Sequence, residues 1–360
     1  MKRVLALILA VAMLLLASCG TDNTPTVTDG SSVAAANALQ HEAVKAPFKK
    51  VMSPIVHNNK LIMSVSTQDR AETDCRYLIS YDKGSGDYKT IFESTYEFGD
   101  ITDIVSSGEW LIWRDHEIYN SGSGIYCMNY ATMKITKIAV TDENSSIDDL
   151  SASDGVVFWY ECSGIGSKKQ ADFIKAYDCK TKELKTISES EGGSWVSAGD
   201  GKAVFMLAKS GKTSLGVYDI ASGNIREIAL GEGNYRWPSC AGGSAVCVYT
   251  DDPTHGSSSQ KTLLIDLSTG KITDAGLMPG QATMFGDYAF ACSATAVWFY
   301  KRSGDSFKPI DGLVDKNAVA AYYGGDNTVI SVAKNAGFGS EEAVNETELH
   351  IFDFNKLNAA

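Results

Sequence analysis

Apolar and polar residues alternate along this chain in short runs that recur seven times, at intervals of 39–49 residues, from about residue 51 to the C-terminus. In each recurrence an apolar run follows a tight turn. The runs are 58–65, 107–113, 153–160, 200–207, 242–249, 286–292 and 325–332. Short alternating runs bounded by turn residues predict β-strands.

A second turn recurs within each unit. It reads YDKGSG at 81–86, YDIASG at 218–223 and IDLSTG at 265–270, with variants at 177–182 and 300–304 and degenerate copies at Asn129 and Asp353. Asp suits the start of this turn because its carboxylate can accept a backbone N–H two residues on, and Gly suits the end because it adopts positive φ. A further short strand follows. Each unit is therefore expected to contain four antiparallel strands, A to D.

Repeated four-stranded units with almost no helical periodicity predict an all-β fold, a β-propeller. Seven turn markers favour seven blades, with six or eight as alternatives. The last unit ends at Ala360, too soon for a complete fourth strand, and an unpaired edge would remain. We therefore expect residues 40–46 to supply that outer strand and close the ring. Residues 48–51 look more strand-like but lie too close to the turn at Asn59.

The N-terminal segment is expected to be processed. Lys2 and Arg3 precede an unbroken apolar run over residues 4–17, which predicts a secretory signal at residues 1–18. The sequence that ends the signal, LASC at 16–19, resembles the lipobox of bacterial lipoproteins. The resemblance implies cleavage before Cys19, acylation of its thiol, and attachment to the extracytoplasmic face of a membrane. Which membrane depends on the Gram type of the host, which stays open. An ordinary signal with a chance cysteine is the alternative.

The remaining chain divides into a tether and a domain. Residues 19–39 contain Cys19 and a Ser-, Thr- and Ala-rich stretch that predicts a flexible tether, and residues 40–360 form the propeller domain. Loss of residues 1–18 removes two cations and no acid, so the net charge changes from −12 to −14. This charge argues against nucleic acid or an anionic membrane surface as a partner. The domain is expected to be monomeric.

Seven cysteines remain after Cys19, and an odd number cannot all pair. Four of them lie in strand runs and are interpreted as buried thiols that behave as small hydrophobic residues. Cys162 and Cys179 flank one connection between strands and are the pair we consider for a disulfide. The absence of C-x-x-C excludes a zinc ribbon.

Long connections fall on one face of the predicted ring. In a propeller the A–B and C–D turns lie on one face, here called the turn face, and the B–C and D–A connections lie on the other, here called the loop face. The long excursions are 67–74, 114–124, 161–171, 251–261 and 333–347, all on the loop face. Because binding residues concentrate in loops held by a rigid scaffold, we expect the site there.

The starts of the innermost strands open onto the loop face and supply the candidate ligand-binding residues. These are Asp100, Asp103, Asp148, Asp149, Trp195, Tyr235, Arg236, Trp237, Gln281, Lys316 and Asn317. Acids from two adjacent blades, aromatic rings from the next two and one arginine would suit a sugar or a peptide. The alternative is that the acids are solvated loop residues and the tryptophans pack between blades.

Catalytic signals are weak. The histidines at 41, 57, 116, 255 and 350 show no metal-binding spacing, and no G-x-S-x-G occurs. We assign no catalytic residue and expect no metal and no cofactor. Asp100 and Asp148 could serve glycoside hydrolysis or lyase chemistry if about 5–10 Å apart.

The motifs Y-D-x-x-S-G after an apolar strand and D-G-K before one resemble the TolB-like and YVTN/WD40-like propeller repeats of bacterial envelope proteins. The resemblance covers nearly the whole mature chain and implies a fold rather than an activity. We expect a membrane-anchored extracytoplasmic module that binds or scaffolds an envelope glycan, peptide or protein. The alternatives are a carbohydrate-active enzyme that uses the acids at the loop face and a purely structural envelope component.

Overall fold

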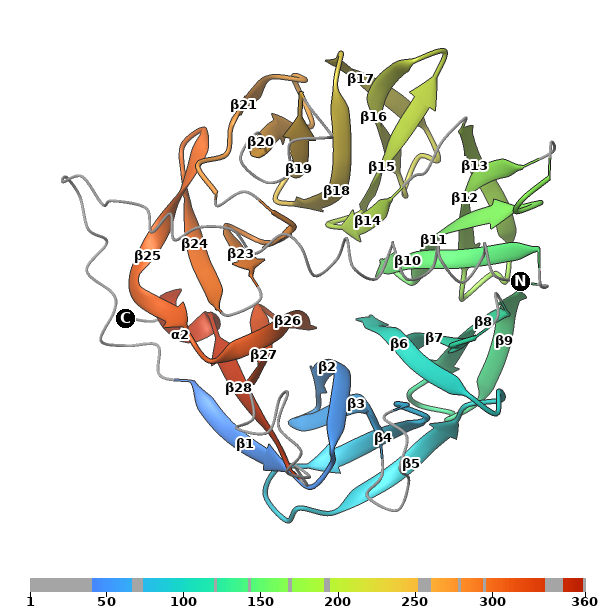
Figure 1. The fold of residues 1–360 in the computed structure, drawn as a ribbon, viewed down its shortest axis with the longest axis vertical. Coiled ribbons are helices and arrows are strands. Elements are labelled where there is room, and N and C mark those ends of the chain that lie inside the picture. The colour runs from blue at the N-terminus through green and yellow to red at the C-terminus, as the bar shows by residue number, and fades with distance from the viewer. Residues whose placement is uncertain are drawn as a thin grey trace, which may run out of the picture.

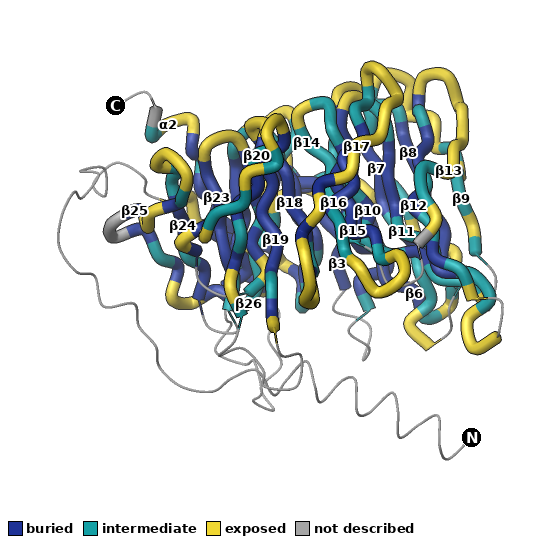
Figure 2. Tube along the Cα trace, turned by 90° about the horizontal axis from the view of Figure 1, so that it is seen from above, coloured by how far each residue is buried: buried dark blue, intermediate teal, exposed yellow. Residues whose placement is uncertain are grey.

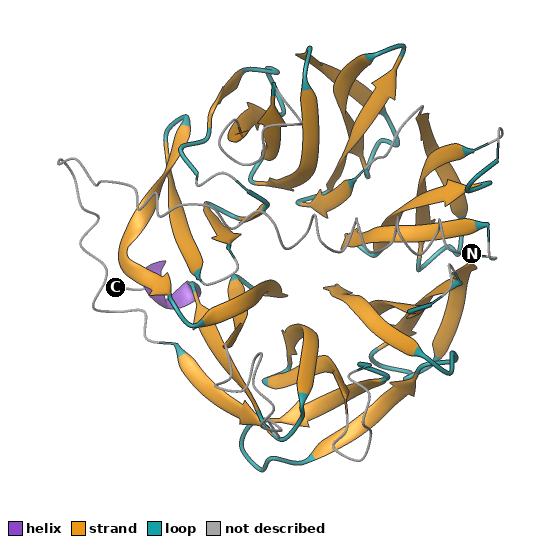
Figure 3. Cartoon of the chain, in the orientation of Figure 1, coloured by secondary structure: helices purple, strands orange, loops and turns teal. Residues whose placement is uncertain are grey.

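The computed structural model describes residues 41–66, 74–119, 122–141, 144–167, 170–190, 195–251, 260–277, 280–293, 296–333 and 346–358. Seven four-stranded antiparallel sheets stand as blades around a common axis, so the predicted seven-bladed propeller is confirmed (Figure 1). Among the described residues, helix is confined to α2 (Asn355–Asn358), shown in purple in Figure 3. No described helix has the length and hydropathy needed to cross a bilayer.

The strands follow the predicted order within each blade. Blade 1 contains β2 (Lys50–His57), β3 (Lys60–Ser66), β4 (Tyr77–Asp82) and β5 (Tyr88–Glu93), and blade 2 contains β6 (Gly99–Ser107), β7 (Trp110–Glu117), β8 (Ser123–Asn129) and β9 (Ile135–Val140). Blade 3 contains β10 (Ser145–Ser153), β11 (Val156–Ser163), β12 (Ala171–Asp178) and β13 (Leu184–Ser190), and blade 4 contains β14 (Val196–Gly199), β15 (Lys202–Lys209), β16 (Lys212–Asp219) and β17 (Ile225–Gly231).

Blade 5 contains β18 (Asn234–Ala241), β19 (Ser244–Thr250), β20 (Gln260–Asp266) and β21 (Ile272–Asp274), and blade 6 contains β22 (Ala282–Phe285), β23 (Tyr288–Cys292), β24 (Val297–Ser303) and β25 (Ser306–Asp315). Blade 7 contains β26 (Ala318–Gly325), β27 (Thr328–Ala333), β28 (Thr347–Asp353) and β1 (Glu42–Ala46). The first strand of each blade lies nearest the axis, and the first strands of blades 1 to 6 contact one another in sequence, as do those of blades 7 and 1.

The ring is closed by a strand from the N-terminal side of the domain. β1 pairs antiparallel with β28, with Val44 opposite Leu349. The Thr347 hydroxyl donates a hydrogen bond to the carbonyl of Phe48, 2.9 Å away, and so ties the chain after β1 to the start of β28. The predicted closure by residues 40–46 is therefore confirmed over the part that the structure describes. Phe48 is buried beyond the strand.

The turns have the predicted chemistry. At the A–B turn of blade 3, Asp154 and Gly155 both have positive φ, as a two-residue hairpin that matches the strand twist requires. At the C–D turn of blade 1, Asp82 Oδ1 accepts hydrogen bonds from the backbone N–H groups of Gly84 at 2.9 Å and Ser85 at 3.2 Å. These turns are tight and lie along one face of the ring.

The apolar core is distributed between blades. One cluster, for example, joins Ile62 of blade 1 to Ile101 and Trp113 of blade 2, all 3% exposed or less. Figure 2 shows the buried residues as a band through the wall of the ring, with exposed residues along both edges. Neighbouring inner strands are also joined directly, because the Ser53 hydroxyl accepts a hydrogen bond from the N–H of Asp103, at 3.2 Å.

The disulfide considered between Cys162 and Cys179 is wrong. Both thiols are free and buried. Cys162 lies opposite Asp172 near the start of β12, whereas Cys179 follows the end of that strand. Seven residues of extended chain separate these levels, which corresponds to about 23 Å. The two cysteines are close in the sequence pattern but lie at opposite ends of one blade.

Residues 1–40 lie outside the described residues, and with them the predicted signal, Cys19 and most of the tether. The domain boundaries at residues 18 and 39 therefore stay predictions.

Candidate functional site

A recurrent bulge in the inner strands determines which residues reach the loop-face end of the ring. The β2–β3, β6–β7, β10–β11 and β18–β19 pairings each lose register near the same level. At that level one residue of the inner strand has positive φ, namely Ser53 (48°), Asp103 (51°), Asp149 (53°) and Trp237 (51°). A bulge redirects its side chain and increases the local twist. Retaining four strained non-glycine residues at one level suggests a functional position.

Each of these residues stands six positions before the second residue of its A–B turn. Counting in the same way through the other blades completes a set that we call the bulge ring. Its members in blade order are Ser53, Asp103, Asp149, Trp195, Trp237, Gln281 and Ala321. Five of them are residues that the sequence proposed as ligand-binding. The ring has an acidic side in blades 2 and 3 and an aromatic side in blades 4 and 5.

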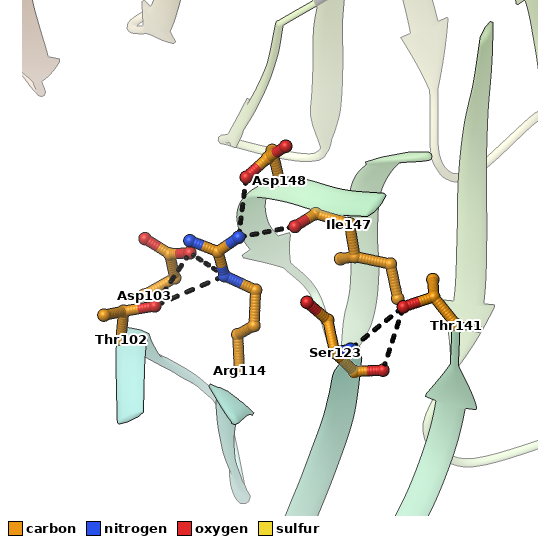
Figure 4. Close-up of polar contacts among 7 residues, drawn as sticks. All are labelled: Thr102, Asp103, Arg114, Ser123, Thr141, Ile147 and Asp148. Atoms are coloured by element: carbon orange, nitrogen blue, oxygen red, sulfur yellow. Dashed lines mark hydrogen bonds and ion pairs between the residues drawn. The ribbon is translucent and has the colours of Figure 1, made fainter. Parts of the chain in front are cut away.

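Arg114 joins the acids of the two blades (Figure 4). Its Nε lies 2.8 Å from Asp103 Oδ2, and its Nη1 lies 2.6 Å from Asp148 Oδ1. Nη1 also donates to the carbonyl of Ile147, and Nε donates to the Thr102 hydroxyl at 3.3 Å. The arginine side chain is only 15% exposed, whereas the Asp103 and Asp148 side chains are 31% and 49% exposed. A nearly buried guanidinium with two partly solvated acid partners thus joins β7 of blade 2 to β10 of blade 3.

Arg114 was not among the predicted site residues, although the sequence contains a signal for it. The hairpin turn at Gly108 fixes the register of β6 against β7, and counting outward from it places Arg114 beside Asp103. The structure pairs Arg114 with Thr102, one residue away, because of the bulge. An arginine placed across a strand pair from an acid is a favourable cross-strand neighbour.

Asp149 is the most perturbed acid of the site. Burial, with the neighbouring carboxylates of Asp103 and Asp148, raises its pKa to about 7, although Arg114 acts in the opposite direction. Near neutral pH this carboxyl is therefore divided between its protonated and ionised forms. A carboxyl in that state can donate a hydrogen bond to a ligand oxygen or, once ionised, accept one.

Asp100, near the start of β6, and His116, near the end of β7, lie closer to the loop-face end than the Arg114 bridge. Asp100 accepts a hydrogen bond from the backbone N–H of Cys75 and lies 3.7 Å from Lys50 Nζ, so its carboxylate holds the chain just before β4 of blade 1. His116 is opposite Asp100 in the β6–β7 register, and burial followed by the charge of Arg114 lowers its pKa. Its Nδ1 is buried and has no hydrogen-bond partner among the described residues.

The aromatic side consists of two tryptophans from adjacent blades. The rings of Trp195 and Trp237 meet edge to face, with centroids 6.4 Å apart and planes at 67°. Both side chains are half-buried, so part of each ring remains accessible. Tyr235 belongs to a different environment, because it is 7% exposed and donates its hydroxyl to the carbonyl of Leu230 in the core between blades 4 and 5.

The other predicted residues are placed around the same end of the ring. Arg236 is half-buried on β18, Gln281 is exposed just before β22, and Lys316 and Asn317 are exposed in the turn between β25 and β26. Among the described residues, no hydrogen bond, ion pair or ring contact joins these four to the Arg114 bridge or to the tryptophan pair.

The loops above the site are only partly described. Residues 67–73, 252–259 and 334–345, which make up most of three predicted excursions, lie outside the described residues. The other two excursions are shorter than expected, because β7 continues to Glu117 and β11 to Ser163. Within the described part of the chain, no three His, Cys, Asp or Glu side chains are grouped so that they could hold a metal ion.

A groove of about 460 Å³ lies on the opposite, turn face, between blades 1 and 2. One wall is a parallel stack of His57 on Tyr130, with ring centroids 3.5 Å apart. Tyr88 and Met133, each about half exposed, line the same groove. The sequence proposed no site on this face.

No protein-family profile matches the chain. No curated protein matches it in sequence. Several solved structures share its fold. The β-propeller domain of the Trilobed protease from Pyrococcus furiosus is 12% identical, with a TM-score of 0.58 over 86% of this chain and 94% of that one.

Oligogalacturonate lyase from Vibrio parahaemolyticus is 12% identical, with a TM-score of 0.57 over 88% of this chain and 97% of that one. TolB from Acinetobacter baumannii is 12% identical over 85% of this chain and 64% of that one, with a TM-score of 0.41. At such identities the first two comparisons establish the propeller fold alone.

Proposed function

We propose that the protein is a membrane-anchored, extracytoplasmic binding module that holds a glycan or a peptide at the loop-face end of its ring. The observation that carries this proposal is the bulge ring, which brings two acids, Asp103 and Asp149, and a tryptophan pair to one level of the fold, with Arg114 bound to Asp103 and to the neighbouring Asp148. Rings that stack on a ligand, beside a few oriented polar groups, form a common kind of small-ligand site.

The acidic side favours a neutral or cationic ligand. Arg114 neutralises part of the charge of Asp103 and Asp148, and Lys50 lies near Asp100. The carboxyl of Asp149 adds a group that can donate or accept a hydrogen bond near neutral pH. Sugar hydroxyls and peptide N–H groups both provide partners for such a set.

The chain enters the domain on the turn face, which favours an orientation in which the loop face points away from the membrane. The His41 ring lies 5.5 Å from Phe352, at the end of β28 on the turn face. The 21 residues from Gly20 to Gln40 can span at most about 70 Å. If Cys19 carries the lipid, the tether therefore joins the domain on the face opposite the Arg114 bridge.

A second candidate function is a carbohydrate-active enzyme. The observation in its favour is Asp149, a carboxyl with a pKa of about 7 beside two further carboxyl groups, because unequal pKa values in neighbouring acids suit general acid and base catalysis. Incubation of the protein with envelope glycans and uronate-containing polysaccharides tests it. Turnover that is lost in Asp149→Asn would replace the binding proposal with this one.

The direct test of the binding proposal is a glycan array and a peptide library probed with the mature chain. A hit should be weakened by Trp237→Ala and unaffected by Trp110→Ala. Trp110 is a matched control because it is also half-buried but lies at the turn-face end of β7. Equal loss of binding in both variants would contradict a site on the loop face.

A further inference from the structure

The turn-face groove between blades 1 and 2 contains apolar side chains that the described residues leave exposed. Ile62 and Met128 line it and are 3% and 1% exposed, so they belong to the core beneath it. Tyr88 and Met133 line it as well but are 52% and 51% exposed. Its volume of about 460 Å³ is within the range of small-ligand sites. The groove is therefore large enough for a ligand and offers apolar surface to one.

Met133 lines the groove from a strained backbone position. It belongs to the C–D turn of blade 2, where its N–H donates to the carbonyl of Asn129 at 2.8 Å. The equivalent turn contact is made by a glycine in blades 1, 4 and 5, namely Gly86, Gly223 and Gly270. Met133 has a φ of 55°, in the left-handed region that favours glycine. A long apolar side chain kept at this position, at an energetic cost, points to a role for that side chain.

The aromatic wall of the groove is held in place on both sides. The rings of His57 and Tyr130 stack with centroids 3.5 Å apart and planes at 6°. Asn58 Nδ2 lies 3.0 Å from His57 Nε2, and the Tyr130 hydroxyl donates to the Ser106 hydroxyl at 3.2 Å. Burial lowers the pKa of His57, which favours the neutral imidazole near neutral pH. Because the wall is already ordered, a ligand that packs against it loses little affinity to the ordering of side chains.

The charged groups that line the groove have both signs. Lys60 Nζ lies 3.9 Å from Asp82 Oδ2, and these side chains are 52% and 43% exposed. Asp87 and Lys89 are exposed and make no ion pair with any residue that the structure describes. A hydroxyl group both donates and accepts hydrogen bonds, so it can pair with an ammonium group and a carboxylate at the same time. A strongly charged ligand, by contrast, would be repelled by half of this set.

We propose that the groove is a binding site for a neutral glycan, separate from the site on the loop face. A sugar ring combines an apolar C–H face with a rim of hydroxyl groups. The face packs against Tyr88 and Met133, and the hydroxyl groups form hydrogen bonds with Asp87, Lys89 and Lys60. The proposal does not depend on which ligand binds at the loop face.

The test is calorimetric titration of the full mature chain with maltose, cellobiose and N,N′-diacetylchitobiose. At least one of these disaccharides should bind, and Met133→Gly should weaken its binding by roughly five-fold or more. The Tm of Met133→Gly should be unchanged or higher, because glycine relieves the strain of the left-handed backbone. Lys182→Gly is the matched control, since Lys182 makes the same turn contact in blade 3 with a φ of 63°, and it should leave binding unchanged.

A second pair of variants tests the charged groups. Lys89→Gln should weaken binding, whereas Lys185→Gln, at the second residue of the equivalent strand β13, should not. Absence of binding by all three disaccharides would overturn the proposal. Binding that survives Met133→Gly but is lost in Trp237→Ala would also overturn it and would place the sugar at the loop face. A third contrary result is Met133-dependent binding of the peptide Gly-Phe-Gly without sugar binding, which would assign the groove to a peptide.

Discussion

His350 Nδ1 lies 2.7 Å from Asp315 Oδ2, and this contact ties the last blade to the blade before it. Both side chains are nearly buried, at 7% and 5% exposure. Asp315 also accepts a hydrogen bond from the Ser331 hydroxyl, and His350 Nε2 lies 2.9 Å from Glu348 Oε1. The His41 ring, which precedes the closing strand, packs 4.2 Å from His350. An ionic network thus lies where the two ends of the domain meet.

The contribution of this network to the free energy of unfolding should be greatest between about pH 4 and pH 6.5. Burial alone would raise the pKa of Asp315, but hydrogen bonds from His350 and Ser331 outweigh it and lower the pKa to about 2. Its contribution is present above the unfolded pKa of 3.8 and is lost as the pH falls toward 2. Hydrogen bonding to Asp315 raises the pKa of His350, so its contribution is complete below 6.5 and is lost as the pH rises through the folded pKa.

Denaturant unfolding across the pH range measures this effect. His350→Gln should remove the decline on the alkaline side, and Asp315→Asn should cost about 3–5 kcal/mol because a buried charged partner loses its counter-ion. Protonation of His41 is disfavoured by burial and by His350, so this ring should not reproduce the profile. An unchanged alkaline decline in His350→Gln would assign the effect to another group.

Closure should depend on β1. Val44 and Ala46 are buried against blade 7, and β1 supplies the outer edge partner of β28. Truncation of the chain to begin at residue 50 should therefore abolish cooperative unfolding, because it exposes an apolar edge. Truncation to begin at residue 32 should have almost no effect. Calorimetry of both proteins checks the difference, and equal melting would show that the ring closes in another way.

Loss of Arg114 should affect stability and the titration of Asp149 together. Arg114→Gln removes the cation from two partly exposed carboxylates and should cost about 2 kcal/mol, within the range for hydrogen bonds to charged groups. Because Arg114 lowers the pKa of Asp149, its removal should raise that pKa above the present value of about 7. NMR titration of the Asp149 carboxyl measures the shift. Lys60→Gln is the control, because this lysine makes only an exposed contact of 3.9 Å with Asp82.

Membrane attachment should depend on the thiol of Cys19. Cys19→Ala should block acylation and the cleavage that accompanies it in lipoproteins. The described residues offer no helix that could replace the anchor. Fractionation of cells and metabolic labelling with a fatty acid check the result. Retention in the membrane fraction of a secreted chain that begins at residue 20 would contradict lipid anchoring.

The fold was predictable because the residue types and spacing of the turns indicate where each hairpin lies. Asp154 and Gly155 adopt positive φ as the sequence pattern requires, and the spacing of turn markers placed Asp103, Asp149 and Trp237 at equivalent positions. That spacing was enough to align inner strands without knowledge of the bulges. The missing fourth strand of the last blade likewise identified residues 40–46, because an open edge is unfavourable.

The contacts between blades were harder to predict, because they depend on the side-chain direction at each level of a strand. Tyr235 is two residues from Trp237 but packs into the core, since the bulge changes the alternation between them. Arg114 lies on the second strand and was not considered among inner-strand residues. Cys179 and Cys127 lie 52 positions apart in the sequence but belong to one apolar cluster between blades 2 and 3, which no local pattern reveals.

Substitution of the tryptophan pair should separate a ligand platform from blade packing. Trp195 and Trp237 are half-buried and meet edge to face, so each retains accessible ring surface. If they form the aromatic side of the site, Trp195→Ala and Trp237→Ala should each weaken ligand binding by roughly 1–3 kcal/mol. The loss of stability should be smaller than for a fully buried aromatic residue, whose removal from a core costs about 3–5 kcal/mol.

Both quantities should be measured on the same variants, by calorimetric titration with a ligand from the array and by denaturant unfolding. Trp113→Ala provides the packing reference, because Trp113 is fully buried between blades 1 and 2 and should lose stability without a specific loss of affinity in the folded fraction. If Trp195→Ala and Trp237→Ala behave like this reference, the two rings hold the blades together. The site would then have to lie on the acidic side alone.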